Sequence, residues 1–295
     1  MIGSAYAGRL LQAGHDVVLV ARGARLIDLQ SAGLVLVDGE SGVRTAQPVV
    51  AVSAPPSEDR FDLVLVPLRA EQIEVALPIL SGMSDDSDVL FFGNNGDHVT
   101  KIAAALGTRA LFGFPAVGGS RVGQVIEYVV IRQQKTMLGE LDGTTTPRLL
   151  HLKRVLEAAG FATSITGDIR AWLLGHIAFV VPIAFALYRV GVDPKRLARD
   201  RSTIRLLVLA TREAFGALHA AGNHEIPTNL RVLYRLPGVL VMAYWKRVLA
   251  GRRGELWFGA HTRAAPAEMR ALARGLQDAV VRAGHPAPHL RRLLA

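Results

Sequence analysis

GSAYAGRLLQAGHDVVLVARGARL, residues 3–26, contains the strongest structural signals in the chain. Residues 4–14 are mostly small and apolar with their polar side chains on one face, which predicts a helix closed by a glycine. The run VVLV at residues 17–20 predicts a short buried strand, and a second helix is predicted at residues 24–32. A helix, a strand and a helix in close succession indicate an α/β domain.

The same alternation continues along the first half of the chain. We expect further helices at residues 70–80 and 99–106, and buried strands at residues 62–67, 88–92 and 110–114. We also expect a hairpin of residues 34–37 and 43–52, and an antiparallel pair of residues 125–133 and 136–139. Continuous apolar strands that alternate with helices predict a parallel sheet covered on both faces.

The pattern changes after about Pro147, where the remaining signals are almost all helical. We expect helices at residues 151–159, 171–188, 200–221, 236–249 and 266–283. The predicted fold class is therefore α/β, with a Rossmann-type parallel-sheet domain followed by an all-helical domain. We place these domains at residues 1–167 and 168–295.

Composition limits the kind of protein this can be. The 34 basic and 25 acidic residues give a net charge of +9, but the basic residues are scattered and no nucleic-acid-binding motif is recognisable. We therefore expect a generally basic surface and no nucleic-acid partner. The chain has no cysteine, which excludes disulfides and cysteine-based zinc sites, and we expect no metal site. No basic start followed by a long apolar run marks the N-terminus, so we expect a cytoplasmic protein.

One apolar segment, residues 171–188, is almost long enough to cross a bilayer, which takes about 20 residues. A membrane span is one interpretation, and a helix buried at the centre of a helical domain is the other. Gly175, His176 and Pro182 interrupt the run, and arginines flank it. We favour the buried helix and expect no membrane partner.

A dinucleotide-binding fingerprint is partly present at the start of the chain. Gly3 fits the third glycine of G-x-G-x-x-G, and Ser4 begins the helix whose N-terminus would face a pyrophosphate. The first strand and the first two glycines would lie before Met1, so we expect upstream codons to encode them. Arg22 follows the next strand, 19 residues after Gly3, where an arginine suits the 2′-phosphate of NADP. The alternative interpretation is a solvated arginine at a strand end.

Several segments form a set with residues 3–26: DLVLVPLRAEQ at 62–72, LFFGNNG at 90–96, residues 114–119 followed by 136–139, and RRGELWFGAH at 252–261. In their order and spacing these segments resemble the ketopantoate reductase family. The resemblance implies an N-terminal Rossmann domain, a C-terminal helical domain and NADP as cofactor. It also implies hydride transfer from NADPH to the ketone of 2-dehydropantoate, which yields pantoate.

The resemblance assigns roles to individual residues. Arg22 matches the family's arginine at the adenosine phosphate, and Arg69 stands where the family usually has a lysine near the cofactor phosphate. Asn95 matches an asparagine near the nicotinamide. Glu255 matches an acidic residue that helps to bind the hydroxyl end of the substrate.

Other family positions have changed. Leu174 stands where the family has the lysine that protonates the substrate carbonyl, and Ala178 and Val181 replace two asparagines. Ala243 replaces a serine that holds the substrate carboxylate. His176 lies in the same predicted helix and is a candidate to donate the proton instead, together with Glu255, because an imidazole titrates near neutral pH. The alternative is a core histidine bound to a backbone carbonyl.

Three hypotheses for function remain open. The first is an NADP-dependent oxidoreductase that acts on a small-molecule 2-keto acid such as 2-dehydropantoate. The second is a catalytically impaired or inactive family member that still binds the nucleotide. The third is an incomplete reading frame in which neither activity survives. The assembly state is open as well, with a homodimer among the alternatives.

Overall fold

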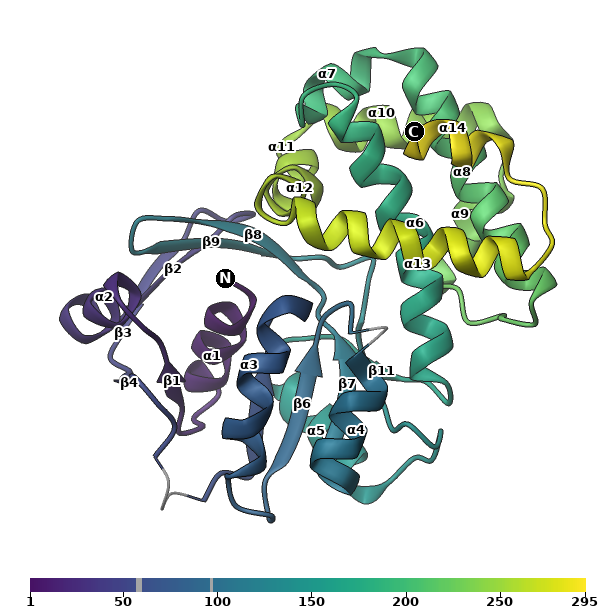
Figure 1. Cartoon of the computed structure of the whole chain (residues 1–295). Coiled ribbons are helices and arrows are strands. Elements are labelled where there is room, and N and C mark those ends of the chain that lie inside the picture. The colour runs from purple at the N-terminus through teal and green to yellow at the C-terminus, as the bar shows by residue number, and fades with distance from the viewer. Residues whose placement is uncertain (57–59, 96–97) are drawn as a thin grey trace. The chain divides into compact units, whose positions relative to one another are not determined.

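The computed structural model describes residues 1–56, 60–95 and 98–295, in two compact units. Unit 1 is Met1–Ile169 and unit 2 is Arg170–Ala295. Unit 1 mixes helices with strands, and every regular element of unit 2 is helical (Figure 1). The structure thus confirms the predicted α/β fold class with a helical second domain.

Unit 1 contains the alternating elements that the sequence predicts. Its helices are α1 (Ile2–Gln12), α2 (Ala24–Ala32), α3 (Ala70–Ser81), α4 (Val99–Leu106), the short 3-10 turn η2 (Gly107–Arg109) and α5 (Pro147–Ala158). Its strands are β1 (Val18–Val20), β2 (Leu34–Asp38), β3 (Arg44–Gln47), β4 (Val50–Val52), β5 (Leu63–Val66), β6 (Asp88–Phe92), β7 (Ala110–Phe114), β8 (Val117–Val122), β9 (Val125–Val130), β10 (Thr136–Gly139) and β11 (Thr163–Ile165).

The largest sheet has the strand order β11-β10-β7-β6-β5. Strands β5, β6 and β7 are parallel to one another, as predicted, while β10 runs antiparallel to β7 and parallel to β11. In Figure 1, helices α3 and α4 lie in front of this sheet and α5 lies behind it. The carboxyl ends of β5 and β6 therefore meet at one edge, where ligands of α/β sheets bind.

Two strand pairings differ from the prediction. The hairpin of β2 with β3 forms, but Pro48 follows β3, and β4 pairs in parallel with β1 instead of extending the hairpin. Strand β9 does not pair with β10, because β8 precedes it through a tight turn at Gly123 and takes its antiparallel edge. The other edge of β9 pairs in parallel with β2, giving the order β3-β2-β9-β8. Strand β8 contains glycines at positions 118 and 119, and the sequence therefore does not predict it.

Within the described ranges, β1 pairs only with β4 and β5 pairs only with β6. Each of these two strands therefore has one edge without a strand partner in that part of the chain. Their side chains Leu19, Leu63 and Leu65 pack on the unit 1 core while remaining only partly buried.

Helix α1 packs closely against the sheets because it is built from small residues around one tyrosine. A methyl group on Gly8 would lie 2.2 Å from Cδ1 of Leu36, so a larger residue here would force the side chain of Leu36 in β2 to shift. Tyr6 is fully buried, and its hydroxyl binds Thr136 Oγ1 at 2.6 Å and accepts from the Ala116 backbone N–H at 3.2 Å. Burial of the phenol without these partners would be costly. The ring also stacks on Phe161 at 4.0 Å.

A buried carboxylate joins the sheet to α5. Glu140 accepts two hydrogen bonds from Arg148, at 2.8 and 2.6 Å, and a third from Thr146 Oγ1 at 2.6 Å. Arg148 also donates to Asp88 Oδ1 at 2.7 Å. These partners raise the pKa of Arg148 and fix the start of α5 against β6 and β10. A bidentate arginine is the geometry that best compensates a buried carboxylate.

Unit 2 surrounds one long apolar helix. Its helices are α6 (Ile169–Tyr188, which begins at the last residue of unit 1), α7 (Pro194–Arg199), α8 (Arg201–Ala220), α9 (Thr228–Arg235), α10 (Gly238–Ala250), α11 (Arg252–Gly254), the π-helical turn η3 (Glu255–Gly259), α12 (Ala260–Ala264), α13 (Pro266–Arg282) and α14 (Pro288–Leu294). The sequence predicts α6, α8, α10 and α13, and it misses the shorter helices α7, α9 and α12.

Helix α6 is long and apolar enough to cross a membrane, but 72% of its apolar window is buried inside the structure. Its side chains Ile177, Val181 and Leu187 belong to the core of unit 2. That packing is the arrangement expected of a central helix in a helical domain.

Candidate functional site

The N-terminus of α1 lies at the carboxyl edge of the large sheet. Gly3 packs against Pro67, the residue that follows β5, and a methyl group at position 3 would lie 2.7 Å from Cγ of that proline. A glycine here therefore brings the first turn of α1, including Ser4, to the end of β5. Exposed N–H groups and the helix dipole make such a turn favourable for anions.

Arg25 is the side chain that reaches this turn most directly. It projects from the start of α2 and donates from Nη2 to Ser4 Oγ at 3.3 Å and from Nη1 to the Gln124 carbonyl at 3.1 Å. Burial and then the charge of Arg121 lower the pKa of Arg25. The sequence interpretation did not include Arg25, although its position in the first turn of the helix after Arg22 is a signal that could have found it.

The surroundings of the first turn of α1 are strongly positive. Three guanidinium groups, those of Arg25, Arg121 and Arg69, act electrostatically on residue 1 at the start of α1. These arginines come from α2, β8 and the residue before α3. Three separate elements therefore direct positive charge toward one helix N-terminus, which favours a phosphorylated ligand there.

Arg22 and Arg69 are both exposed. Arg22 follows β1, and Arg69 precedes α3, where its backbone N–H donates to Gln72 Oε1 at 3.2 Å. The structure thus places Arg69 within electrostatic reach of the α1 turn and leaves the Arg22 side chain toward solvent. Both remain predicted phosphate ligands.

Asn95 lies at the same edge of the sheet, just after β6. A methyl group on Gly93 would lie 3.5 Å from the Leu68 carbonyl, so the segments after β5 and β6 run side by side. Asn95 is 2% exposed, and its Nδ2 has no hydrogen-bond partner among the described residues. A buried amide donor of this kind requires an acceptor, and a bound ligand can supply it. Gly96, the glycine of the predicted Asn-Gly motif, lies outside the described residues.

His176 is buried in unit 2. It is 4% exposed and stacks on Trp172 at 5.5 Å with an angle of 8° between the rings. Burial, with a contribution from the charge of His261, lowers the pKa of His176 to about 3. The imidazole is therefore neutral near pH 7. It can donate one hydrogen bond, but it does not carry the extra proton of a strong general acid.

Glu255 opens the π-helical turn η3 and pairs with Arg263 through Oε1. The carboxylate folds over Gly259, where a methyl group would lie 2.5 Å from Oε2. Arg263 also donates to the Val192 carbonyl at 2.8 Å. π-Helical turns occur frequently at functional sites. The ion pair with Arg263 is the partnership that the sequence interpretation did not foresee.

Apolar residues occupy the positions where the family has polar ones. Ala178 and Val181 are fully buried in the core of unit 2, and Leu174 packs against that core. Ala243 is exposed on α10. These side chains cannot donate or accept a proton, so any polar chemistry of unit 2 rests on its other residues.

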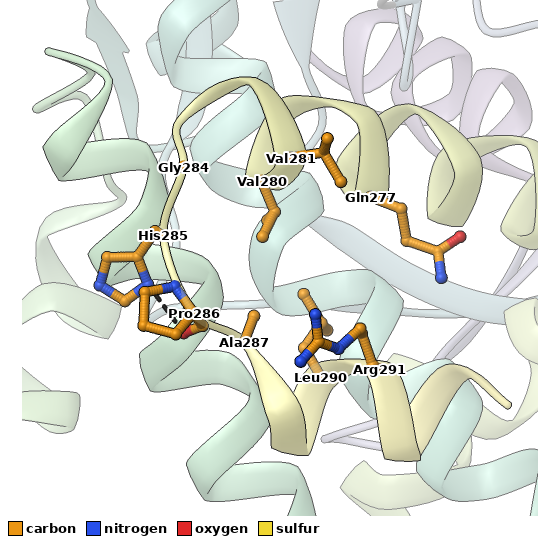
Figure 2. Close-up of a pocket in the computed structure, with 9 residues that line it drawn as sticks. All are labelled: Gln277, Val280, Val281, Gly284, His285, Pro286, Ala287, Leu290 and Arg291. Carbon is orange, nitrogen blue, oxygen red and sulfur yellow. Dashed lines mark hydrogen bonds between the residues drawn. The ribbon is translucent and has the colours of Figure 1, made fainter.

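A surface hollow of about 380 Å³ lies between the end of α13 and α14 (Figure 2). It is lined by Val280, Val281, Leu290, His285 and Arg291, among others. None of the predicted site residues lines it. Within the ranges that the structure describes, no group of three potential ligand residues could hold a metal ion.

Comparison with known proteins identifies the type of fold. Residues 1–143 match the family model described as ketopantoate reductase PanE/ApbA. No curated protein sequence matches the chain. Among solved structures, 2-dehydropantoate 2-reductase from Geobacter metallireducens GS-15 is similar with a TM-score of 0.77 and 16% identity, over 98% of this chain and 93% of that one.

Two further structures are similar over nearly the whole chain. A PanE/ApbA family ketopantoate reductase from Ralstonia eutropha JMP134 has a TM-score of 0.72 and 19% identity, over 99% of this chain and 93% of that one. D-mandelate dehydrogenase, in a ternary structure with NADH and anilino(oxo)acetate, has a TM-score of 0.73 and 14% identity, over 99% and 92%. At these identities the similarity shows the shared fold.

Proposed function

Because residues 1–143 of this chain belong to the ketopantoate reductase PanE/ApbA family, we propose that the protein is an NADP-dependent oxidoreductase. Its substrate is a small 2-keto acid such as 2-dehydropantoate. The proposal includes a cytoplasmic location, and neither nucleic acid nor a membrane as partner. The observation that carries it is the positive first turn of α1 at the carboxyl edge of the sheet, with Arg25 bound to Ser4.

The residues present fit a nicotinamide dinucleotide. Gly3 and Ser4 offer the helix N-terminus to a pyrophosphate, while Arg25 adds a guanidinium. Arg22, at the end of β1, is the side chain proposed for the 2′-phosphate of NADP. The buried Nδ2 of Asn95 lacks a partner within the described ranges and would donate to the nicotinamide end. When bound, NADPH supplies the hydride.

The residues of unit 2 would hold the substrate. Glu255 keeps a carboxylate oxygen that can accept a hydrogen bond from a substrate hydroxyl. His176 is neutral and can donate its N–H to an oxygen that gains negative charge, as hydrogen-bond donors do at developing oxyanions. The final proton would then come from water or from a neighbouring group.

A second candidate function is a nucleotide-binding protein without turnover. The low pKa of His176 favours it, since a neutral imidazole does not carry the proton that the lysine replaced by Leu174 would supply. The two functions share the cofactor site and differ only in unit 2.

Calorimetry followed by kinetics separates these functions. We expect NADPH to bind the purified chain. We also expect the absorbance of NADPH to decay when one member of a panel of 2-keto acids is added. Binding without decay across the whole panel would support the second candidate. Absence of both NADPH and NADH binding would contradict the proposal as a whole.

A further inference from the structure

Glu255 is held by more than its charge. It begins the turn η3, and its carboxylate lies over Gly259, four residues later. A methyl group at position 259 would lie 2.5 Å from Oε2, 3.0 Å from Cδ and 3.1 Å from Cγ of Pro194. Gly259 has ordinary helical dihedral angles, so the missing side chain provides space for the carboxylate and not backbone freedom.

Arg263 forms the other side of this arrangement. Its Nη2 pairs with Glu255 Oε1, and its Nη1 donates to the Val192 carbonyl at 2.8 Å. The side chains of Arg263 and Glu255 are 48% and 43% exposed, and an ion pair at that exposure contributes little to stability. The ion pair therefore adds little to the stability of the fold, but it fixes the orientation of the Glu255 carboxylate.

The acceptor on the far side of Arg263 is itself unusual. Val192 has φ of 57°, the only positive φ at a non-glycine position among the described residues. A β-branched residue in the left-handed region is strained and persists only where its surroundings impose that conformation. Its N–H donates to the Leu187 carbonyl at 2.8 Å, and the next residue, Asp193, caps α7.

A second contact ties the same two segments together. The Tyr188 hydroxyl, at the end of α6, donates to the Thr262 carbonyl at 3.2 Å, next to Arg263. The end of α6 and the residues that follow it are thus joined to the 255–263 segment by two side chains, Tyr188 from the first segment and Arg263 from the second. Together they fix the backbone from which Arg263 reaches Glu255.

We propose that Arg263 is a positioning residue that holds the Glu255 carboxylate in one orientation, with Val192 as its fixed anchor. Oε1 is engaged by the guanidinium, and Oε2 is left to accept a hydrogen bond from a hydroxyl of the substrate. This inference rests on the proposed function, because it assigns Glu255 to substrate binding. It names the side chain that prepares Glu255 for that role.

Six variants of the full chain test the proposal, and two of them carry Glu255→Gln. Arg263→Met removes the guanidinium, and Arg263→Lys keeps a charge that can reach one of its two partners. Gly259→Ala displaces the carboxylate without changing any charge. Gly275→Ala adds the same methyl group to α13 in open space and serves as the matched control.

We expect Arg263→Met and Gly259→Ala to raise KM for the 2-keto acid by roughly tenfold or more, the value of one hydrogen bond to a charged group. The dissociation constant of NADPH should stay unchanged, Arg263→Lys should recover part of the loss, and Gly275→Ala should match the parent. Glu255→Gln combined with Arg263→Met should be no worse than Glu255→Gln alone, since both act through one carboxylate. Additive losses, or an unchanged KM in Arg263→Met, would overturn the assignment.

The test also separates this inference from the proposed function. If the parent chain reduces no 2-keto acid, the proposed function fails, and unfolding of the same variants decides the positioning role. Arg263→Met should then shift the Tm less in a Glu255→Gln background than in the parent background. Equal shifts in both backgrounds would show that the two residues act independently, against the inference.

Discussion

The buried imidazole of His176 makes a quantitative prediction about stability and pH. Its pKa is lowered from 6.5 to about 3, chiefly by burial. Between pH 6.5 and pH 3 the imidazole is protonated in the unfolded chain and neutral in the folded chain, so acid favours unfolding. Above pH 6.5 the imidazole is neutral in both the folded and the unfolded chain, and its burial costs no stability. As the pH falls from 6.5 toward 3, the free energy of unfolding decreases. At pH 5, 1.5 units below the ordinary pKa, the loss is about 2 kcal/mol.

Urea unfolding of the parent chain and of His176→Phe isolates this contribution. The phenyl ring keeps the stack on Trp172 but cannot titrate. We expect the parent to lose about 2 kcal/mol more than the variant between pH 7 and pH 5, because all other titrating groups are common to both chains. Equal losses would show that folded His176 accepts a proton near neutral pH, against a pKa of about 3. In that case the role of protonated general acid would be open to it.

Three further predictions concern unit 1. Arg25→Ala should weaken the binding of NADPH and NADH alike, by roughly tenfold or more. Arg22→Ala should weaken the binding of NADPH only. Calorimetry with both nucleotides measures these effects, and the reverse pattern would contradict both assignments. Gly8→Ala should destabilise the chain by about 1–3 kcal/mol through overpacking against β2, while Gly275→Ala should be neutral or mildly stabilising in the same urea titration. Arg148→Met should cost about 3 kcal/mol or more at pH 7, because it strands the buried carboxylate that it binds, and a loss below 1 kcal/mol would contradict this.

The sequence predicts the central strands of unit 1 well because their apolar runs are continuous. The bounds of β6, β7 and α4 agree with the sequence interpretation residue for residue. Pairing is harder to predict, since it depends on contacts between distant segments. Pro48 marks the end of β3, but nothing local shows that β4 then pairs with β1, and the glycines of β8 resemble a loop.

The candidate site likewise has residues that the sequence predicts and residues that it does not predict. Gly3 and Ser4 follow from the fingerprint, because the glycine spacing has a direct structural meaning. The approach of Arg25 to Ser4 depends on how α2 packs, over a separation of 21 residues. In unit 2, the pairing of Glu255 with Arg263 depends on a π-helical turn, which hydrophobic periodicity does not reveal.

Nucleotide binding at the first turn of α1 is tested by a calorimetric titration of the chain with NADPH and NADH, repeated with Arg25→Ala. We expect NADPH to bind more tightly than NADH, and Arg25→Ala to lose roughly tenfold or more in affinity for both. Equal affinity for the two nucleotides would remove the assignment of Arg22 to the 2′-phosphate. No heat of binding with either nucleotide would contradict the claim that the first turn of α1 is a dinucleotide site.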